Sequence, residues 1–229
     1  MSETYSQRAF AVPPDATDLI VIRHGASAAL EPGETFELVE GHGDPPLAPE
    51  GREQARRVAE RLHGEPLRAL FVTPLQRTHQ TAEPLVAATG LEPQVIDDLR
   101  EVHLGEWEGG LFRLKVADGD PLALRMFEEQ SWSVIPGAES DEAISTRVRA
   151  AIERIAAAHP DQRVAAFAHG GTIGNVLHQA TGSQRWAFVG ADNASISHIV
   201  VTADRWIVRR FNDTSHLEDT LTAAPEPPT

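Results

Sequence analysis

Three short, unbroken apolar runs constrain the fold of this chain more than any other feature. They occupy residues 19–22, 69–72 and 164–168, with the sequences LIVI, ALFV and VAAFA. Runs of four or five apolar residues are typical of strands buried on both faces, as the central strands of a parallel sheet are. The runs therefore predict a parallel sheet with helices over both of its faces.

The segments between these runs carry the signals of helices. Apolar residues share one helical face over residues 49–63 and again over 140–158. A third helix is expected with Thr73 as its cap and Pro74 at its first position, and a fourth from Thr172. Because helices alternate with the apolar runs, the chain is expected to form an α/β fold, a three-layer sandwich with a mainly parallel central sheet.

The two ends of the chain differ from its middle. Alternating apolar and polar residues over 195–201 and 206–211 predict a closing hairpin. We expect residues 1–16 to be an N-terminal extension, 17–213 to be one domain, and the Pro-rich 214–229 to be a flexible tail.

The composition excludes several classes of function. The chain has 20 Lys and Arg against 34 Asp and Glu, a net charge of −14, so that binding of nucleic acid is not expected. It has no cysteine, which removes disulfides, thiolate zinc sites and cysteine nucleophiles. No apolar segment has the length of a membrane span or of a signal peptide, and we expect a cytoplasmic protein.

Polar residues follow each apolar run at the point where the strand should end. They are Arg23-His24-Gly25, Thr73-Pro74-Leu75-Gln76-Arg77 and His169-Gly170-Gly171. In parallel sheets, ligands bind beyond the carboxyl ends of the strands. Two histidines and two arginines are therefore expected to meet in one crevice.

Such a crevice suits a phosphoryl group. Arg23 and Arg77 supply fork-shaped donors, and the glycines let backbone N–H groups approach an oxyanion. The arginines disfavour a charged imidazole, so His24 or His169 keeps a lone pair that can attack phosphorus. No metal or other cofactor is expected, because the arginines and histidines already neutralise the phosphoryl charge.

With these residues in view, the chain resembles the histidine phosphatase superfamily, also called the phosphoglycerate mutase-like family. The segments that carry the resemblance are LIVIRHG (19–25), TPLQRTHQTA (73–82), LREVHLGEWEG (99–109) and FAHGG (167–171). Arg-His-Gly alone is weak evidence, whereas four segments in the order of the family are specific.

The resemblance implies a role for each matching residue. His24 corresponds to the nucleophile that becomes phosphohistidine, and Arg23, Arg77 and His169 correspond to the rest of the phosphate pocket. Glu101 corresponds to the general acid that protonates the leaving alkoxide and then activates water. Glu106 and Glu108 lie nearby in the sequence as rivals for this role.

The segment after Arg-His-Gly departs from the pattern of the family. Ser27 fits the pattern, and it is a candidate phosphate contact together with Gly170. Leu30 stands where many members have an asparagine of the phosphate pocket. We expect the core chemistry to survive this change and the substrate to differ.

Residues 110–135 mix aromatic, aliphatic and basic side chains. They are expected to form either a buried helical subdomain or a lid that selects the leaving group. The function predicted for the whole chain is a metal-independent phosphatase of small phosphorylated metabolites, with membranes excluded as partners. A phosphoglycerate mutase and a non-catalytic phosphate-binding module are the alternatives, and a homodimer is left open.

Overall fold

The computed structural model describes residues 7–31 and 33–217. Its centre is a six-stranded sheet in the order β5-β4-β6-β1-β7-β8. The neighbours from β5 to β1 pair in parallel, and β7 and β8 complete the sheet as an antiparallel hairpin. The predicted mainly parallel sheet and closing hairpin are both confirmed.

The elements have the following bounds. The strands of the sheet are β1 (Thr17–Arg23), β4 (Leu67–Val72), β5 (Pro93–Val95), β6 (Arg163–Ala168), β7 (Ile196–Val201) and β8 (Trp206–Asp213), and a separate small hairpin joins β2 (Leu38–Val39) to β3 (His42–Gly43). The α-helices are α1 (Pro49–Leu62), α2 (Gln76–Thr89), α3 (Leu111–Ala117), α4 (Pro121–Glu129), α5 (Asp141–Ala158) and α6 (Gly170–Thr181). Short 3₁₀ turns are η1 (Asp97–Leu99), η2 (Gly105–Trp107) and η3 (Trp132–Val134).

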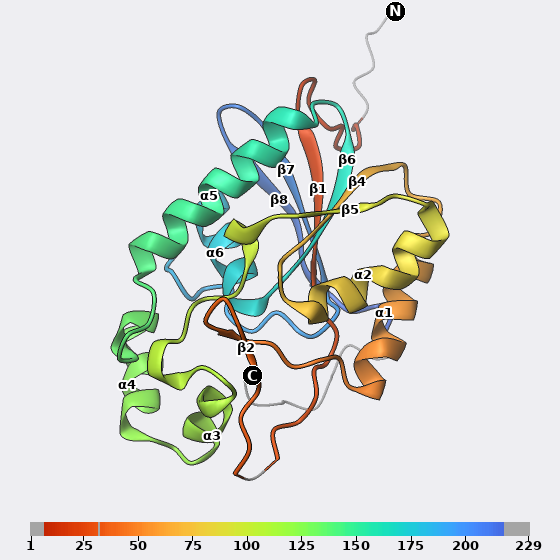
Figure 1. Cartoon of the computed structure of the whole chain (residues 1–229). Helices are drawn as coiled ribbons and strands as arrows, with labels where there is room; N and C mark the ends of the chain where they lie inside the picture. Colours follow the sequence, from red (N-terminus) through yellow and green to blue (C-terminus); the bar gives the residue numbers. More distant parts are fainter. Residues whose placement is uncertain (1–6, 32, 218–229) are drawn as a thin grey trace, which may run out of the picture.

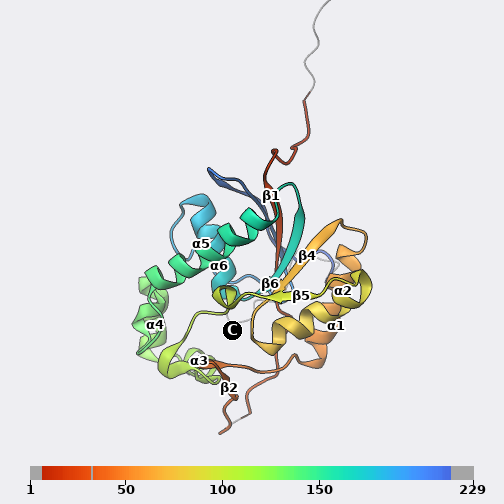
Figure 2. The ribbon, with the colours of Figure 1, turned by 45° about the horizontal axis from the view of Figure 1, so that its top comes forward.

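Helices cover both faces of the sheet (Figures 1 and 2). Helices α1 and α2 pack on one face, where Val58 and Leu85 are fully buried, and α5 and α6 pack on the other, where Val148 and Leu177 are fully buried. Each face buries the alternate residues of β1, because successive side chains of a strand point to opposite sides. The predicted three-layer sandwich is confirmed.

A third apolar cluster lies outside the two cores that the sheet forms with the helices on its faces. It is built on Trp107, Phe112, Ala123, Met126 and Ile135, which come from η2, α3, α4 and the segment after η3. These elements lie at the bottom of Figure 1, together with the small β2–β3 hairpin, beyond the carboxyl end of β1. Residues 110–135 therefore have a small core of their own beside the end of the sheet where ligands bind.

The start of α2 differs from the prediction. The helix begins at Gln76 with Leu75 before it, instead of at Pro74 with Thr73 as its cap. The Thr73 hydroxyl lies 3.1 Å from the Thr78 hydroxyl and 2.9 Å from Nε2 of His169, and it accepts from Leu75 N at 3.4 Å, one residue before the helix begins. Arg77 still falls in the first turn of the helix. Helix α6 likewise begins at Gly170, two residues before the predicted start.

Some expectations fall partly or wholly outside the described residues. Residues 218–229 of the predicted tail and residues 1–6 of the predicted extension are not among them. The proposed domain boundaries therefore stay predictions. None of the helices in the described ranges is both long and apolar enough to cross a membrane.

Candidate active site

His24 and His169 meet because β1 and β6 are adjacent parallel strands. Arg23 pairs with Ala168 in register, so the residue after each strand lies at the same edge of the sheet. The two imidazole ring centroids are 5.2 Å apart, and both side chains are buried. The predicted convergence of strand ends places these two histidines in direct contact.

The hydrogen bonds of His24 define which ring nitrogen is free. Nδ1 lies 2.8 Å from the carbonyl oxygen of Gly25. Because a carbonyl can only accept, Nδ1 carries the proton and Nε2 keeps its lone pair. Burial lowers the pKa of His24 well below its usual range, and the charges of Arg77 and Arg23 lower it further. The imidazole is therefore neutral and nucleophilic at neutral pH.

His169 is more deeply buried than the sequence suggests. Its Nε2 is hydrogen-bonded to the Thr73 hydroxyl, and its Nδ1 is buried without a partner within the described residues. Burial lowers its pKa well below the usual range, and Arg77 and His24 add to this effect. The side chain lies behind His24 and does not form part of the cavity wall.

Two arginines flank His24 on the wall of the cavity, as the sequence predicted. Arg77 donates to the carbonyl of Gly43 at 3.0 Å, and burial lowers its pKa to about 10. The first turn of α2, where Arg77 lies, already uses two of its N–H groups, because Gln76 N donates to Asp44 Oδ1 at 2.8 Å and Thr78 N donates to the carbonyl of Leu75 at 3.0 Å. Arg23 donates from Nη1 to the carbonyl of Ala191 at 2.5 Å. Both arginines line the cavity as cations at neutral pH, and the binding of a phosphoryl group by them stays a prediction.

A third arginine in the cavity was missed as a site residue by the sequence analysis. Arg113 of α3 donates to the carbonyl of Ala28 and to the hydroxyl of Ser27, each at 2.8 Å. Its guanidinium carbon lies 5.3 Å from the centre of the Phe36 ring. No local pattern marks Arg113, because its partners lie 85 and 86 residues away. Ser27 lines the cavity as expected, with Arg113 fixing its hydroxyl.

The glycines act differently from the prediction. The Gly25 N–H donates to the Thr81 hydroxyl at 3.0 Å, and the Gly171 N–H donates to Glu101 at 3.2 Å. Neither is free for an oxyanion. Gly25 is required by packing instead, because a Cβ there would lie 2.5 Å from the carbonyl oxygen of Gly51. Gly170 lines the cavity as predicted.

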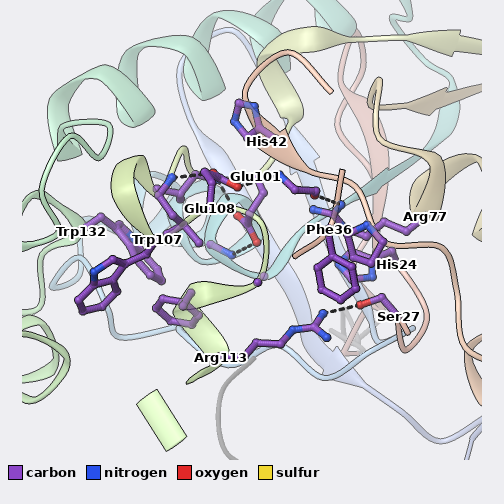
Figure 3. Close-up of a pocket in the computed structure, with 18 of the residues that line it drawn as sticks. His24, Ser27, Phe36, His42, Arg77, Glu101, Trp107, Glu108, Arg113 and Trp132 are labelled. Atoms are coloured by element: carbon purple, nitrogen blue, oxygen red, sulfur yellow. Dashed lines mark hydrogen bonds between the residues drawn. The ribbon is translucent and has the colours of Figure 1, made fainter. Parts of the chain in front are cut away.

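Glu101 lies on the cavity wall at the N-terminus of α6. Its Oε1 accepts from Val102 N at 2.9 Å and from Thr172 N at 3.2 Å, and its Oε2 accepts from Gly171 N. A Cβ on Gly171 would lie 2.7 Å from Oε1. Three backbone N–H groups and the absence of a side chain on Gly171 therefore fix the position of this carboxyl group on the cavity wall (Figure 3).

The two rival carboxylates are placed differently. Glu106 is exposed and is not part of the cavity wall. Glu108 lines the cavity, but its two oxygens accept from Leu104 N and Gly43 N, each at 2.8 Å. These bonds fit the anchoring of two loops. Glu101 and Glu108 both line the cavity and both accept backbone N–H bonds, whereas Glu106 does not line it, so the assignment of the general acid to Glu101 stays a prediction.

Leu30 is directed to the lid, defined here as residues 110–135. Its two methyl carbons lie so close to Gly110 of the lid that a Cβ there would be 2.9 and 3.0 Å from them. Leu30 does not contribute to the cavity wall, so the polar group expected from an asparagine is absent from this position. Within the described residues, no group of three or more histidine, aspartate or glutamate side chains is placed to hold a metal ion.

Comparison with known proteins places this site in a family. The sequence model of the histidine phosphatase superfamily (branch 1) matches residues 19–214, which include every site residue described above. The chain belongs to the histidine phosphatase superfamily. The predicted family is thereby confirmed.

The relatives of this histidine phosphatase include phosphatases and mutase-like proteins. Phosphoglycerate mutase-like protein 4 of Arabidopsis thaliana is 31% identical over 210 residues, covering 90% of this chain and 89% of the relative. The metal-independent phosphoserine phosphatase of the same plant is 31% identical over 212 residues, covering 90% and 85%. A mycobacterial glucosyl-3-phosphoglycerate phosphatase structure has a TM-score of 0.73 at 29% identity, covering 86% of this chain and 99% of that one. The prediction of a phosphomonoesterase is confirmed by these matches.

Proposed function

We propose that this histidine phosphatase hydrolyses phosphomonoesters of small metabolites through a phosphohistidine on His24. The observation that carries the proposal is the free Nε2 lone pair of His24 on a cavity wall between Arg23 and Arg77. Three arginines, with Arg113 as the third, offset the charge of a phosphate dianion, so the proposed reaction requires no metal ion.

The first step transfers the phosphoryl group. Nε2 of His24 attacks phosphorus, the ester P–O bond breaks, and the leaving oxygen takes a proton from Glu101. An alcohol therefore leaves in place of an alkoxide, and phosphohistidine remains in the pocket.

The second step restores the enzyme. Glu101, now a carboxylate, takes a proton from a water molecule, and the oxygen of that water attacks phosphorus. The P–N bond breaks, inorganic phosphate forms, and His24 returns to its neutral state. The bond from Nδ1 to Gly25 holds the imidazole in the same orientation through both steps.

A phosphate-release screen without added metal tests the proposal. The panel holds phosphoserine, phosphoglycerates, sugar phosphates and nucleoside monophosphates, and the products of phosphoglycerates are analysed for isomerisation. Release of inorganic phosphate supports the phosphatase. Isomerisation without release would show a mutase, and tight binding with neither product would show a binding module. A cytoplasmic location and a homodimer stay predictions alongside this one.

A further inference from the structure

The cavity has two chemically different ends. One end carries the charged groups around His24, and the other is formed by large apolar side chains of the η2 segment, of the lid and of the loop after α6. This second wall, called here the aromatic wall, consists of Leu104, Trp107, Phe112, Phe127, Trp132 and Trp186. It holds three of the four tryptophans of the chain. The cavity has a volume of about 140 Å³ and includes both ends.

The rings of the aromatic wall hold one another in place. The centroids of Trp132 and Trp186 are 4.7 Å apart, and those of Phe127 and Trp186 are 5.7 Å apart in an edge-to-face arrangement. Behind them, Met126 and Ile135 are almost completely buried. Paired aromatic rings in these geometries stabilise each other beyond the burial of their area. The wall is therefore built before any substrate binds.

Four of these side chains are not completely covered by the protein. Leu104, Phe127, Trp132 and Trp186 are only partly buried, whereas Trp107 and Phe112 of the same wall are buried. Their remaining apolar surface faces solvent or the cavity they line. An apolar ligand group that covers this surface removes it from water, which is favourable.

Most polar side chains near the aromatic wall already have partners, the exceptions on the cavity wall being Nε1 of Trp186 and Nε2 of His42, which are buried without a partner within the described residues. Both oxygens of Glu108 accept backbone N–H bonds, and Ser27 is bonded to Arg113. The hydroxyl groups of a sugar would lose their water on entering this end of the cavity and would gain few bonds in return. Burying a hydroxyl without a partner is costly, so the wall disfavours a polyol.

We propose that the aromatic wall binds the leaving group, and that the preferred substrates are phosphate monoesters of alcohols with an aromatic or bulky apolar group. The inference rests on the proposed function, because the same cavity must first hold a phosphoryl group at His24. The phosphate end fixes the phosphorus, and the aromatic wall then selects what is attached to it.

Two substrates with the same phosphoryl group and comparable alcohols provide the test. They are 3-phenylpropyl phosphate, with an apolar leaving group, and glycerol 3-phosphate, with a polar one. Both are primary alkyl esters, so the need for a proton from Glu101 is similar. We expect kcat/KM for 3-phenylpropyl phosphate to be roughly 10- to 100-fold higher, since hydrophobic pocket contacts discriminate to about this extent.

Two tryptophan variants locate the preference. Trp132→Ala removes a ring from the wall and should lower the ratio of the two kcat/KM values by roughly 10-fold or more. Trp206→Ala is the matched control, because Trp206 lies on β8 against Arg149, with 5.0 Å between guanidinium carbon and ring centre, and is not part of the cavity wall. It should leave the ratio unchanged. Because both kcat/KM values are measured on one preparation, their ratio does not change when part of the protein fails to fold.

The outcomes separate this inference from the proposed function. Hydrolysis of neither ester, nor of any other phosphomonoester, would end the proposed function. Hydrolysis of both with equal or greater efficiency for glycerol 3-phosphate would overturn the inference and leave the function standing. An unchanged ratio in Trp132→Ala would also overturn it, because the wall would then be a structural core only.

Discussion

Replacement of Glu101 by glutamine removes the proton that the side chain can donate and largely keeps the position of the side chain. The amide is close to the carboxyl group in shape, and its oxygen can still accept from Val102 N and Thr172 N. The amino group would face the Gly171 N–H, which now donates to Oε2 at 3.2 Å. One hydrogen bond is lost and two donors oppose each other, which costs about 1–3 kcal/mol of folding stability. The protein is expected to stay folded.

The chemical cost of the same change is larger and depends on the leaving group. Glutamine cannot protonate an alkoxide, and general acid catalysis contributes roughly 10²–10⁴-fold, or about 2.7–5.5 kcal/mol of activation free energy. A p-nitrophenolate leaves without a proton, so phosphoryl transfer from p-nitrophenyl phosphate should slow by roughly 10-fold or less. The difference between the two substrates is the signature of the acid.

Rapid-quench measurement of the first turnover tests this expectation. The burst isolates the first step, whereas steady-state turnover includes water activation, which Glu101 serves for both substrates. Glu106→Gln is the matched control, because Glu106 lies five residues further along the chain, is exposed and is absent from the cavity wall. Equal loss of the burst rate with an alkyl phosphate and with p-nitrophenyl phosphate would refute the assignment of Glu101 and point to Glu108.

Three further predictions concern stability, metal and a glycine. The pKa values of His24 and His169 in the folded protein lie well below the ordinary histidine value of 6.5, so below pH 6.5 the unfolded chain binds more protons than the folded protein. As the pH falls, these two histidines should therefore lower the free energy of unfolding by up to about 2.7 kcal/mol for each pH unit. Urea unfolding at pH 6 and 5 should show this slope, and His24→Asn should reduce it by about half; an unaltered slope would contradict the neutral imidazole. Excess chelator should leave hydrolysis nearly unchanged in a phosphate-release assay, and complete loss restored by a divalent ion would end the metal-independent reaction. Gly171→Ala should displace the Glu101 carboxylate, because the added Cβ would lie 2.7 Å from Oε1. The burst rate with an alkyl phosphate should then fall by roughly 10-fold or more, while the burst rate with p-nitrophenyl phosphate is preserved. Equal alkyl phosphate burst rates for the wild type and the variant would show that this position of the Glu101 carboxylate is not required.

The fold was predictable because its central strands are continuous apolar runs. Residues 19–22 of β1, 69–72 of β4 and 164–168 of β6 are buried, so the central part of each strand appears in the sequence as an apolar run. Strand β5 was not predicted, because it has three residues, two of them exposed, and begins with a proline. The β2–β3 hairpin was missed for a similar reason, since Leu38 and Val39 are exposed. Such short elements depend on their neighbours more than on their own sequence.

The candidate site was predictable only where its residues follow strand ends. His24 and Arg77 are placed by the parallel neighbours β1, β6 and β4, which a sequence pattern can indicate. The position of Arg113 depends on how the lid folds back over the Ser27 loop, which no local pattern records. The complete burial of His169 and the contact of its Nε2 with the Thr73 hydroxyl join residues 96 positions apart, which no local pattern records either.

Trapping of the phosphorylated enzyme tests the central claim most directly. The account requires a covalent phosphoryl group on Nε2 of His24 during turnover. Acid-quenched protein from a reaction with ³²P-labelled substrate should carry a label that is stable in alkali and lost in acid on longer incubation, and a peptide containing His24 should hold it. His24→Ala should abolish both label and hydrolysis while the fold, monitored by circular dichroism, is preserved. Label that persists in His24→Ala, or hydrolysis that persists without it, would contradict the account.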